Sequence, residues 1–229
     1  MTLAATPAYD PSGRTAVPGS QLVGILSIAT GVASVVLLAI HPADDAKTFA
    51  DALRSEAANR LIDGIVHGGF IAVLSLQLVC YSVFSARLGE ARPASIAALV
   101  FFSAGAIFLS GSMALDGLVT PAVAARYLAA PGKLEYARSL FVLLGSLISV
   151  LMPIGLMFLS AAIAAWGWTL SESGVSRAAG VLGTITGGLM LVVLGASFTA
   201  MNPFVLMGAI VANAIWATVT GIMLLRTKQ

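Results

Sequence analysis

Charged residues are scarce in this chain: Asp, Glu, Lys and Arg together make up 10% of its 229 residues. A soluble domain usually carries about 25% charged residues. A chain with so few, in which 59% of residues are hydrophobic, would aggregate in water. The net charge is only +2 and the basic residues are scattered, which argues against nucleic acid as a partner. The composition therefore predicts a protein whose main partner is the lipid bilayer.

The sequence also lacks the motifs of several common chemistries. It contains no Gly-rich phosphate loop and no G-x-S-x-G, H-E-x-x-H or C-x-x-C motif. No lysine lies inside a long apolar run, which excludes a retinal Schiff base. The single cysteine, Cys80, cannot form an intrachain disulfide, and its place in the middle of an apolar run favours a small buried side chain.

What the chain does contain is six long apolar runs separated by short polar breaks. A spanning helix needs about 20 apolar residues, whereas a barrel strand needs about 10, and these Leu-, Ala- and Gly-rich runs match the first length. A helix also satisfies its own backbone hydrogen bonds in lipid. The sequence therefore predicts an all-α bundle of six transmembrane helices over residues 21–226. The expected spans are 21–40, 61–86, 94–115, 139–165, 177–199 and 203–225.

The segments outside these spans are short. Residues 1–20 are rich in proline and glycine and predict a disordered tail. In loop one, apolar residues recur at helical spacing and predict a short amphipathic helix at the membrane interface. These residues are Ala46, Phe49, Ala50, Leu53 and Ala57. In loop three, Thr120 and Pro121 are expected to begin a second interfacial helix. We expect both helices to cover the outer end of the bundle.

Six spans place both termini on the same side of the membrane. The two sides carry equal numbers of basic residues, but those on the side of the termini stand in very short connections or directly against span ends. Examples are Arg87, Arg92, Arg177 and Arg226. The positive-inside rule is strongest at such positions. The sequence therefore predicts a bacterial inner-membrane protein with both termini, including the tail, in the cytoplasm.

The two histidines are both expected near the outer surface, together with acidic residues. His41 ends the first span, Asp63 and His67 begin the second, and Asp116 ends the third. A carboxylate and an imidazole four residues apart on a helix can bond each other or share a ligand. His67 should lie about 6 Å along the helix axis from Asp63, near the hydrocarbon edge. An ionisable side chain at that depth is a functional hypothesis by default.

Three interpretations of these four residues remain open. They could be structural, with His67 bonded to Asp63 and the other groups solvated. They could form a metal or proton site, in which His41, His67 and Asp63 would suit zinc or another divalent first-row metal. They could also orient a small molecule in a cavity. Haem fits less well, because its two axial histidines need matching depth and His41 is expected to lie higher than His67.

Other polar residues follow helical stripes. Gln77 and Tyr81 continue the helix face of His67, and Phe70 and Leu74 lie between His67 and Gln77 on that face. This order of polar and apolar residues fits either a gated pathway or two ordinary buried hydrogen bonds. Hydroxyl side chains on the first and fourth spans are expected to face other helices. They are Ser27, Thr30, Ser34, Ser139, Ser146, Ser149 and Ser160. Trp166 and Trp168 are expected at the membrane interface.

These patterns do not fix one function. We expect a non-catalytic bundle that binds a ligand or a membrane partner subunit through its outer face, with homo-oligomers as a further option. The alternative is a small transporter or proton-coupled carrier that uses Asp63, His67 and Asp116. A membrane enzyme ranks third, because a bound metal can activate water.

Overall fold

The computed structural model describes residues 20–42, 46–89, 92–198 and 202–226, so all but Ser20 of the predicted tail lies outside the described residues. The described part is helical and contains no strand. Its α-helices are α1 (Ser20–Ala39), α2 (Phe49–Leu88), α3 (Pro93–Ala114), α4 (Thr120–Leu128), α5 (Leu134–Ser173), α6 (Arg177–Ala196) and α7 (Pro203–Leu225). Six helical segments are long and apolar enough to cross a membrane, which confirms the predicted fold class.

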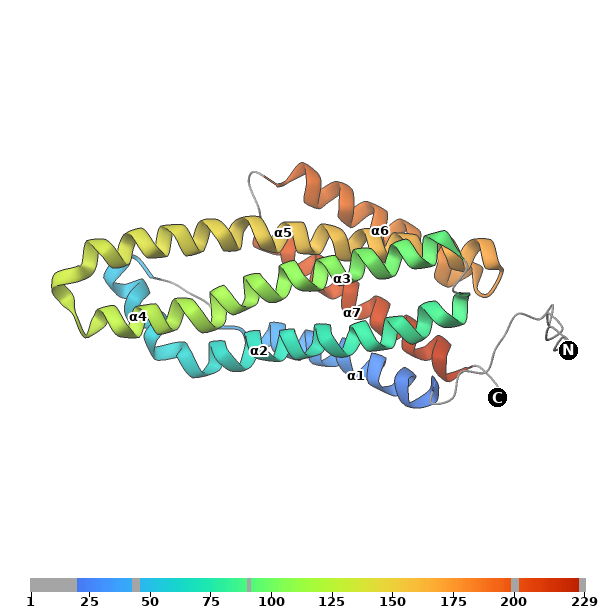
Figure 1. Ribbon diagram of the computed structural model, residues 1–229, viewed down its shortest axis with the longest axis horizontal. Helices are drawn as coiled ribbons and strands as arrows, with labels where there is room; N and C mark the ends of the chain where they lie inside the picture. Colours follow the sequence, from blue (N-terminus) through green and yellow to red (C-terminus); the bar gives the residue numbers. More distant parts are fainter. Residues whose placement is uncertain (1–19, 43–45, 90–91, 199–201, 227–229) are drawn as a thin grey trace, which may run out of the picture.

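The helices have two different lengths. α1, α6 and α7 contain 20, 20 and 23 residues, so they are about 30–35 Å long and match the hydrocarbon core of a bilayer. α2 and α5 contain 40 residues each and are about 60 Å long. Figure 1 shows that the long helices continue past the short ones at the end opposite the two termini. We call this projecting part, residues 49–60, α4 and residues 134–150, the distal region.

The distal region corrects the prediction of separate interfacial helices. Of the residues predicted to form one in loop one, Phe49, Ala50, Leu53 and Ala57 instead lie in the first turns of α2, which begins after its N-cap Thr48, and Ala46 precedes the helix. No glycine or proline lies between Phe49 and Asp63, so nothing in the sequence ends the helix before the span starts. Likewise α4 continues α3, and residues Pro93–Leu128 form one long helical segment. Both outer helices are therefore extensions of spans.

A single π-helical turn, η1 (Leu115–Val119), joins α3 to α4. Pro121 has no N–H to donate to the carbonyl of Gly117, so the α-helical hydrogen-bond pattern is interrupted here. The backbone N–H of Thr120 instead donates to the carbonyl of Leu115, as does the Thr120 hydroxyl at 2.9 Å. Such π-turns are frequent at functional sites. This one carries Asp116.

The core depends on close helix contacts and on aromatic rings. α1 packs against α7 through small residues: a Cβ on Gly24 would lie 2.8 Å from the Gly221 carbonyl oxygen. The predicted α1 stripe of Ser27, Thr30 and Ser34 is buried in this interface, as expected. Trp166 is also fully buried, and its Nε1 donates to the Ser85 hydroxyl at 2.8 Å. The interfacial position predicted for Trp166 was therefore wrong.

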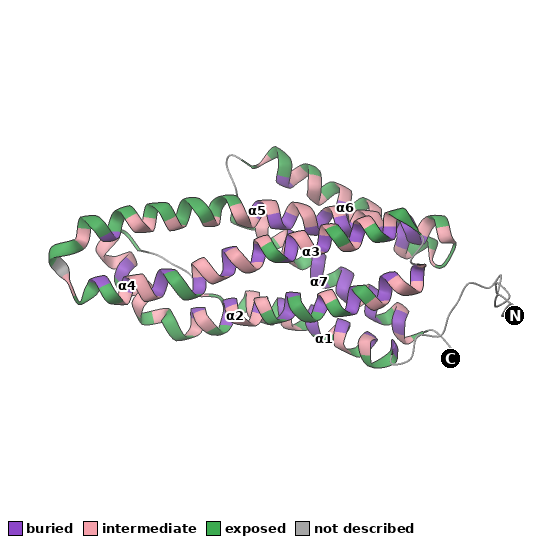
Figure 2. Ribbon diagram, viewed as in Figure 1, coloured by how far each residue is buried: buried purple, intermediate pink, exposed green. Residues whose placement is uncertain are grey.

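The first half of α5 is more exposed than predicted. Figure 2 shows exposed residues along this half of the helix. Ser139, Ser146 and Ser149 are exposed and donate to backbone carbonyls of their own helix, and only Ser160 of the predicted stripe is buried. The expectation that the whole stripe faces other helices was wrong. The first three serines lie in the distal region, which α1, α6 and α7 do not reach.

Candidate functional site

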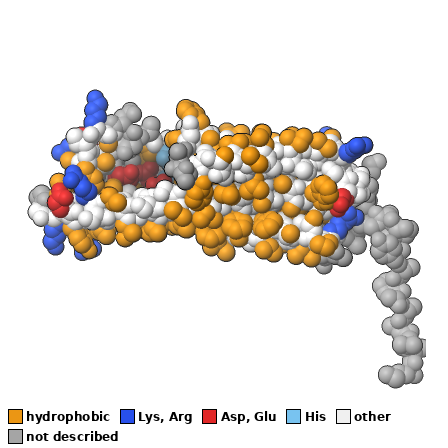
Figure 3. All heavy atoms as spheres, turned by 90° about the horizontal axis from the view of Figure 1, so that it is seen from above, with side chains coloured by type: hydrophobic (Ala, Val, Ile, Leu, Met, Phe, Trp, Pro, Cys, Tyr) orange, Lys and Arg blue, Asp and Glu red, His pale blue; other side chains and the backbone are white. Residues whose placement is uncertain are grey.

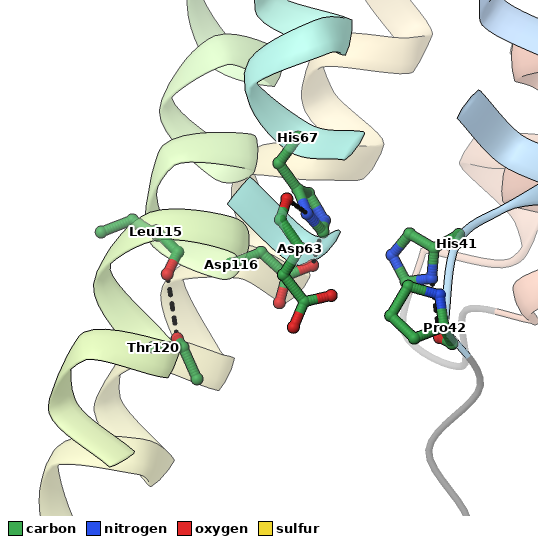
Figure 4. Close-up of polar contacts among 7 residues, drawn as sticks. All are labelled: His41, Pro42, Asp63, His67, Leu115, Asp116 and Thr120. Carbon is green, nitrogen blue, oxygen red and sulfur yellow. Dashed lines mark hydrogen bonds and ion pairs between the residues drawn. The ribbon is translucent and has the colours of Figure 1, made fainter. Parts of the chain in front are cut away.

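The four predicted residues His41, Asp63, His67 and Asp116 meet where the distal region joins the short helices, and we call them the His/Asp site. His41 follows the end of α1, Asp63 and His67 come from α2, and Asp116 comes from η1 (Figure 4). All four line one cavity of about 230 Å³, together with Pro42, Ser55, Glu56 and Asn59. Figure 3 shows acidic side chains and a histidine inside a hollow in this half of the molecule.

His67 is held in one tautomer by its hydrogen bond to the backbone. Its Nδ1 lies 2.9 Å from the backbone carbonyl oxygen of Asp63. A carbonyl oxygen only accepts, so Nδ1 must carry a proton and donate it. The second ring nitrogen, Nε2, then faces Asp116 Oδ2 at 3.1 Å. Histidines that bind metals usually donate their other N–H to a carbonyl or carboxylate in this manner.

His41 has the same arrangement. Its Nδ1 lies 2.9 Å from the backbone carbonyl oxygen of Pro42 and must donate to it, so Nε2 is again left to bind a ligand. Figure 4 shows this second ring nitrogen pointing toward His67 and Asp63. The two imidazole rings are in edge-to-face contact, with their centroids 5.0 Å apart. That contact leaves no space for a porphyrin between them, so the geometry does not suit bis-histidine haem.

Three side chains of the site present ligand atoms at distances that suit a small cation. His41, His67 and Asp116 each offer one ligand atom within 4.8 Å of the other two. With metal–ligand bonds of about 2.0–2.1 Å, neighbouring ligands of a tetrahedral zinc ion lie about 3.3 Å apart. The 3.1 Å separation of His67 Nε2 and Asp116 Oδ2 is close to that value. His41 is exposed and can move closer without disturbing the core.

Asp63 supplies a second carboxylate beside these ligands. The residue is only 7% exposed, and it interacts electrostatically with His41, His67 and Asp116. Its backbone oxygen accepts from His67, but its carboxylate makes no hydrogen bond within the described residues. The carboxylate lines the cavity, and its charge adds to that of Asp116 in attracting a cation there.

Gly117 brings η1 close enough to α2 for this arrangement. A Cβ built on Gly117 would overlap the Cβ and the ring of His67, so the contact requires a residue without a side chain. This role was not predicted, because a glycine next to a predicted span end has many explanations. The pair Asp116-Gly117 at the junction before Thr120-Pro121 was the available signal.

The second polar stripe lies deeper in the bundle. Gln77 Oε1 accepts a hydrogen bond from Asn213 Nδ2 on α7 at 2.9 Å, and both residues are buried. The Tyr81 ring packs in the aromatic core. Buried Phe70 and Leu74 separate this layer from His67. Asn213 was missed, although an amide in the middle of a span indicates an interhelical partner.

Comparison of the chain with protein-family models, with curated proteins and with solved structures finds no match. The geometry of the His/Asp site is therefore the basis on which a function can be proposed.

Proposed function

We propose that this protein is a multi-pass protein of the bacterial inner membrane that binds one divalent first-row metal ion, most readily zinc, at the outer end of its bundle. The ligands are His41, His67 and Asp116. The observation that carries the proposal is that both histidines direct Nδ1 to a backbone carbonyl and keep Nε2 for the ion. Imidazole and carboxylate together are a common ligand set for zinc.

A purely structural ion pair explains less of the site. A protonated His67 could pair with Asp116 at 3.1 Å without any metal. That pair would use His67 and Asp116, but it would leave Nε2 of His41 without a hydrogen-bond partner among the described residues. A divalent cation instead offsets the charges of both carboxylates and uses both histidines. The metal therefore accounts for all four residues.

The surroundings of the site favour binding over transport. Below His67, the side chains of Val66, Phe70 and Met113 form a buried apolar cluster. A metal ion entering from the distal end would meet this cluster after the His/Asp site, and a polar path across the bundle is interrupted there. The outward orientation of the site is part of the proposal and is supported by Arg87, Arg92 and Arg226 at the opposite end.

The test is zinc stoichiometry and affinity of the detergent-purified protein after chelation and reloading. The wild type should bind one equivalent of zinc, and Asp116→Asn should bind it at least about tenfold more weakly because a ligand is lost. Asp51→Asn is the matched control, since it makes the same change at an exposed side chain of α2 that, among the described residues, hydrogen-bonds to Thr48 and Arg54 outside the site. Zinc binding that is absent from the wild type, or equal in both variants, would refute the proposal.

A further inference from the structure

The number of protein ligands in the His/Asp site determines what a bound metal can still take up. A zinc site with four protein ligands is closed, whereas a site with three keeps its fourth position for water or another small ligand. Here His41, His67 and Asp116 present ligand atoms within 4.8 Å of one another. The same residues line a cavity of about 230 Å³, which far exceeds the roughly 15 Å³ that one water molecule requires. The fourth position of the metal therefore has room for water or for a somewhat larger molecule.

Asp63 lies where it can contact the molecule at that position. Its carboxylate lines the cavity, but it is not among the three side chains whose ligand atoms converge. Figure 4 shows the carboxylate beside that of Asp116, pointing away from the His67 ring. A metal–ligand bond of about 2.1 Å followed by a hydrogen bond of about 2.7 Å places a carboxylate oxygen about 4 Å from the metal. Asp63 therefore suits a group that contacts the fourth ligand instead of the metal itself.

A carboxylate at this place selects the fourth ligand by its protons. An ionised carboxylate only accepts hydrogen bonds, so the ligand must carry a proton on the atom that binds the metal. Water and alcohols carry such a proton, whereas azide, halides and ionised carboxylates do not. A hydrogen bond to an ionised acceptor is also about twice as strong as one between neutral groups. Asp63 therefore favours a ligand with a hydroxyl group.

The charges around the cavity favour the same class of ligand. Glu56 adds a third carboxylate to those of Asp63 and Asp116, and none of the described residues that line the cavity is Lys or Arg. Two carboxylates already offset the charge of a divalent metal, so the third makes the surroundings of the fourth position negative. Ser55 and Asn59 add an uncharged hydroxyl and an uncharged amide, which can bind further hydroxyl groups. A neutral polar molecule therefore fits this cavity better than an anion does.

We propose that the fourth position of the metal takes a neutral ligand with a hydroxyl group, an inference that rests on the proposed metal binding. The ligand is water when the site is otherwise empty, and a small alcohol or diol can replace it. The ligand oxygen binds the metal, and its O–H donates to the Asp63 carboxylate. Small anions are kept out, because Asp63 and Glu56 repel them.

The test loads the detergent-purified protein with Co²⁺ in place of zinc, because the visible absorption spectrum of Co²⁺ changes with its ligands. The probes are ethylene glycol, a neutral diol, and azide, an anion without a proton. Glycol should change the wild-type spectrum in a saturable manner. Asp63→Asn should bind azide at least about tenfold more tightly than the wild type, because the substitution removes a like charge close to the anion. It should bind glycol more weakly, because a neutral amide is the weaker acceptor.

The opposite directions of these two changes separate the proposal from a simple folding defect, which would weaken the binding of both probes. Asp51→Asn removes the same charge from α2 outside the cavity and should leave both affinities unchanged. A wild-type spectrum that glycol does not change, or equal azide affinities in wild type and Asp63→Asn, would overturn the inference. Loss of Co²⁺ from Asp63→Asn would overturn it as well, since Asp63 would then be a fourth ligand. These results leave metal binding by the wild type intact, whereas a wild type that binds no metal would refute the proposed function itself.

Discussion

Replacing Gly117 by alanine tests the architecture of the His/Asp site with the smallest possible change. The added methyl group would overlap the imidazole of His67, so either the ring or η1 must move. Forcing an extra carbon into a packed contact typically costs about 1–3 kcal/mol. Because the new atom presses on the side chain of the proposed ligand His67, we expect the movement to fall partly on that residue. The Gly117→Ala variant should therefore lose both stability and metal affinity.

The size of the loss in metal affinity follows from the role of His67. The imidazole is fixed by two contacts, one to the Asp63 carbonyl at 2.9 Å and one to Asp116 at 3.1 Å. Displacing it by a few tenths of an ångström lengthens both. Disturbing the groups that orient a metal ligand typically lowers affinity about 10–100-fold. We expect zinc binding by Gly117→Ala to weaken within that range.

The control is Gly68→Ala, one residue from His67 on α2. A Cβ at Gly68 has no atom within 4 Å, so it fills open space. Alanine is also the better helix former by up to about 1 kcal/mol. Gly68→Ala should therefore bind zinc as the wild type does and unfold at an equal or higher temperature. Isothermal titration and thermal unfolding in detergent measure both quantities. Wild-type zinc affinity in Gly117→Ala would refute the reasoning.

Two further predictions concern pH and the bundle interior. An imidazole must give up its proton to bind a metal, so lowering the pH from 7.5 to 5.5 should weaken zinc binding by about tenfold or more. Isothermal titrations at several pH values measure the zinc affinity, and an affinity that does not change with pH would contradict histidine ligation. Asn213→Leu should destabilise the protein by about 1–3 kcal/mol because it leaves Gln77 buried without its partner. The double variant Gln77→Leu/Asn213→Leu should recover much of that loss, and purely additive losses would show that the amide pair is not coupled.

Helix number and type could be read from the sequence because each span carries its own signal. Apolar length identifies a span without reference to its neighbours, and α1 and α7 agree with their predicted ranges within one residue. Where a helix leaves the apolar run, that signal ends. The first turns of α2 are polar and were assigned to a loop helix, yet they continue the span because no residue stops it. The extent of α2 depends on the absence of a helix breaker more than on hydropathy.

The residues of the His/Asp site could be nominated from sequence, but their geometry could not. Two histidines and two acids at the edges of apolar runs are conspicuous in a chain with so few charges. Their convergence depends on how far α1, α2 and α3 are offset along their axes, which packing decides. The sequence paired Asp63 with His67 through its side chain, whereas the structure uses the Asp63 backbone carbonyl. Trp166 shows the same limit, since tertiary contacts bury a residue that composition places at an interface.

The position of the His/Asp site follows from the two helix lengths. α1 ends at Ala39 after about 30 Å, while α2 and the α3–α4 segment continue. His41 therefore stands at the level where a short helix stops and two long helices still run on, and only at that level can its ring reach residues 63 to 67 of α2. Because α1 ends here, a space remains beyond its end that α6 and α7 do not fill, and the cavity lies in that space. Below it, apolar packing keeps the local dielectric low, which strengthens the attraction between carboxylates and a cation. On the distal side of the site, Ser55, Glu56 and Asn59 line the cavity, so an ion that enters there meets polar side chains. A site one or two turns deeper in the bundle would have the low dielectric constant but no polar entrance.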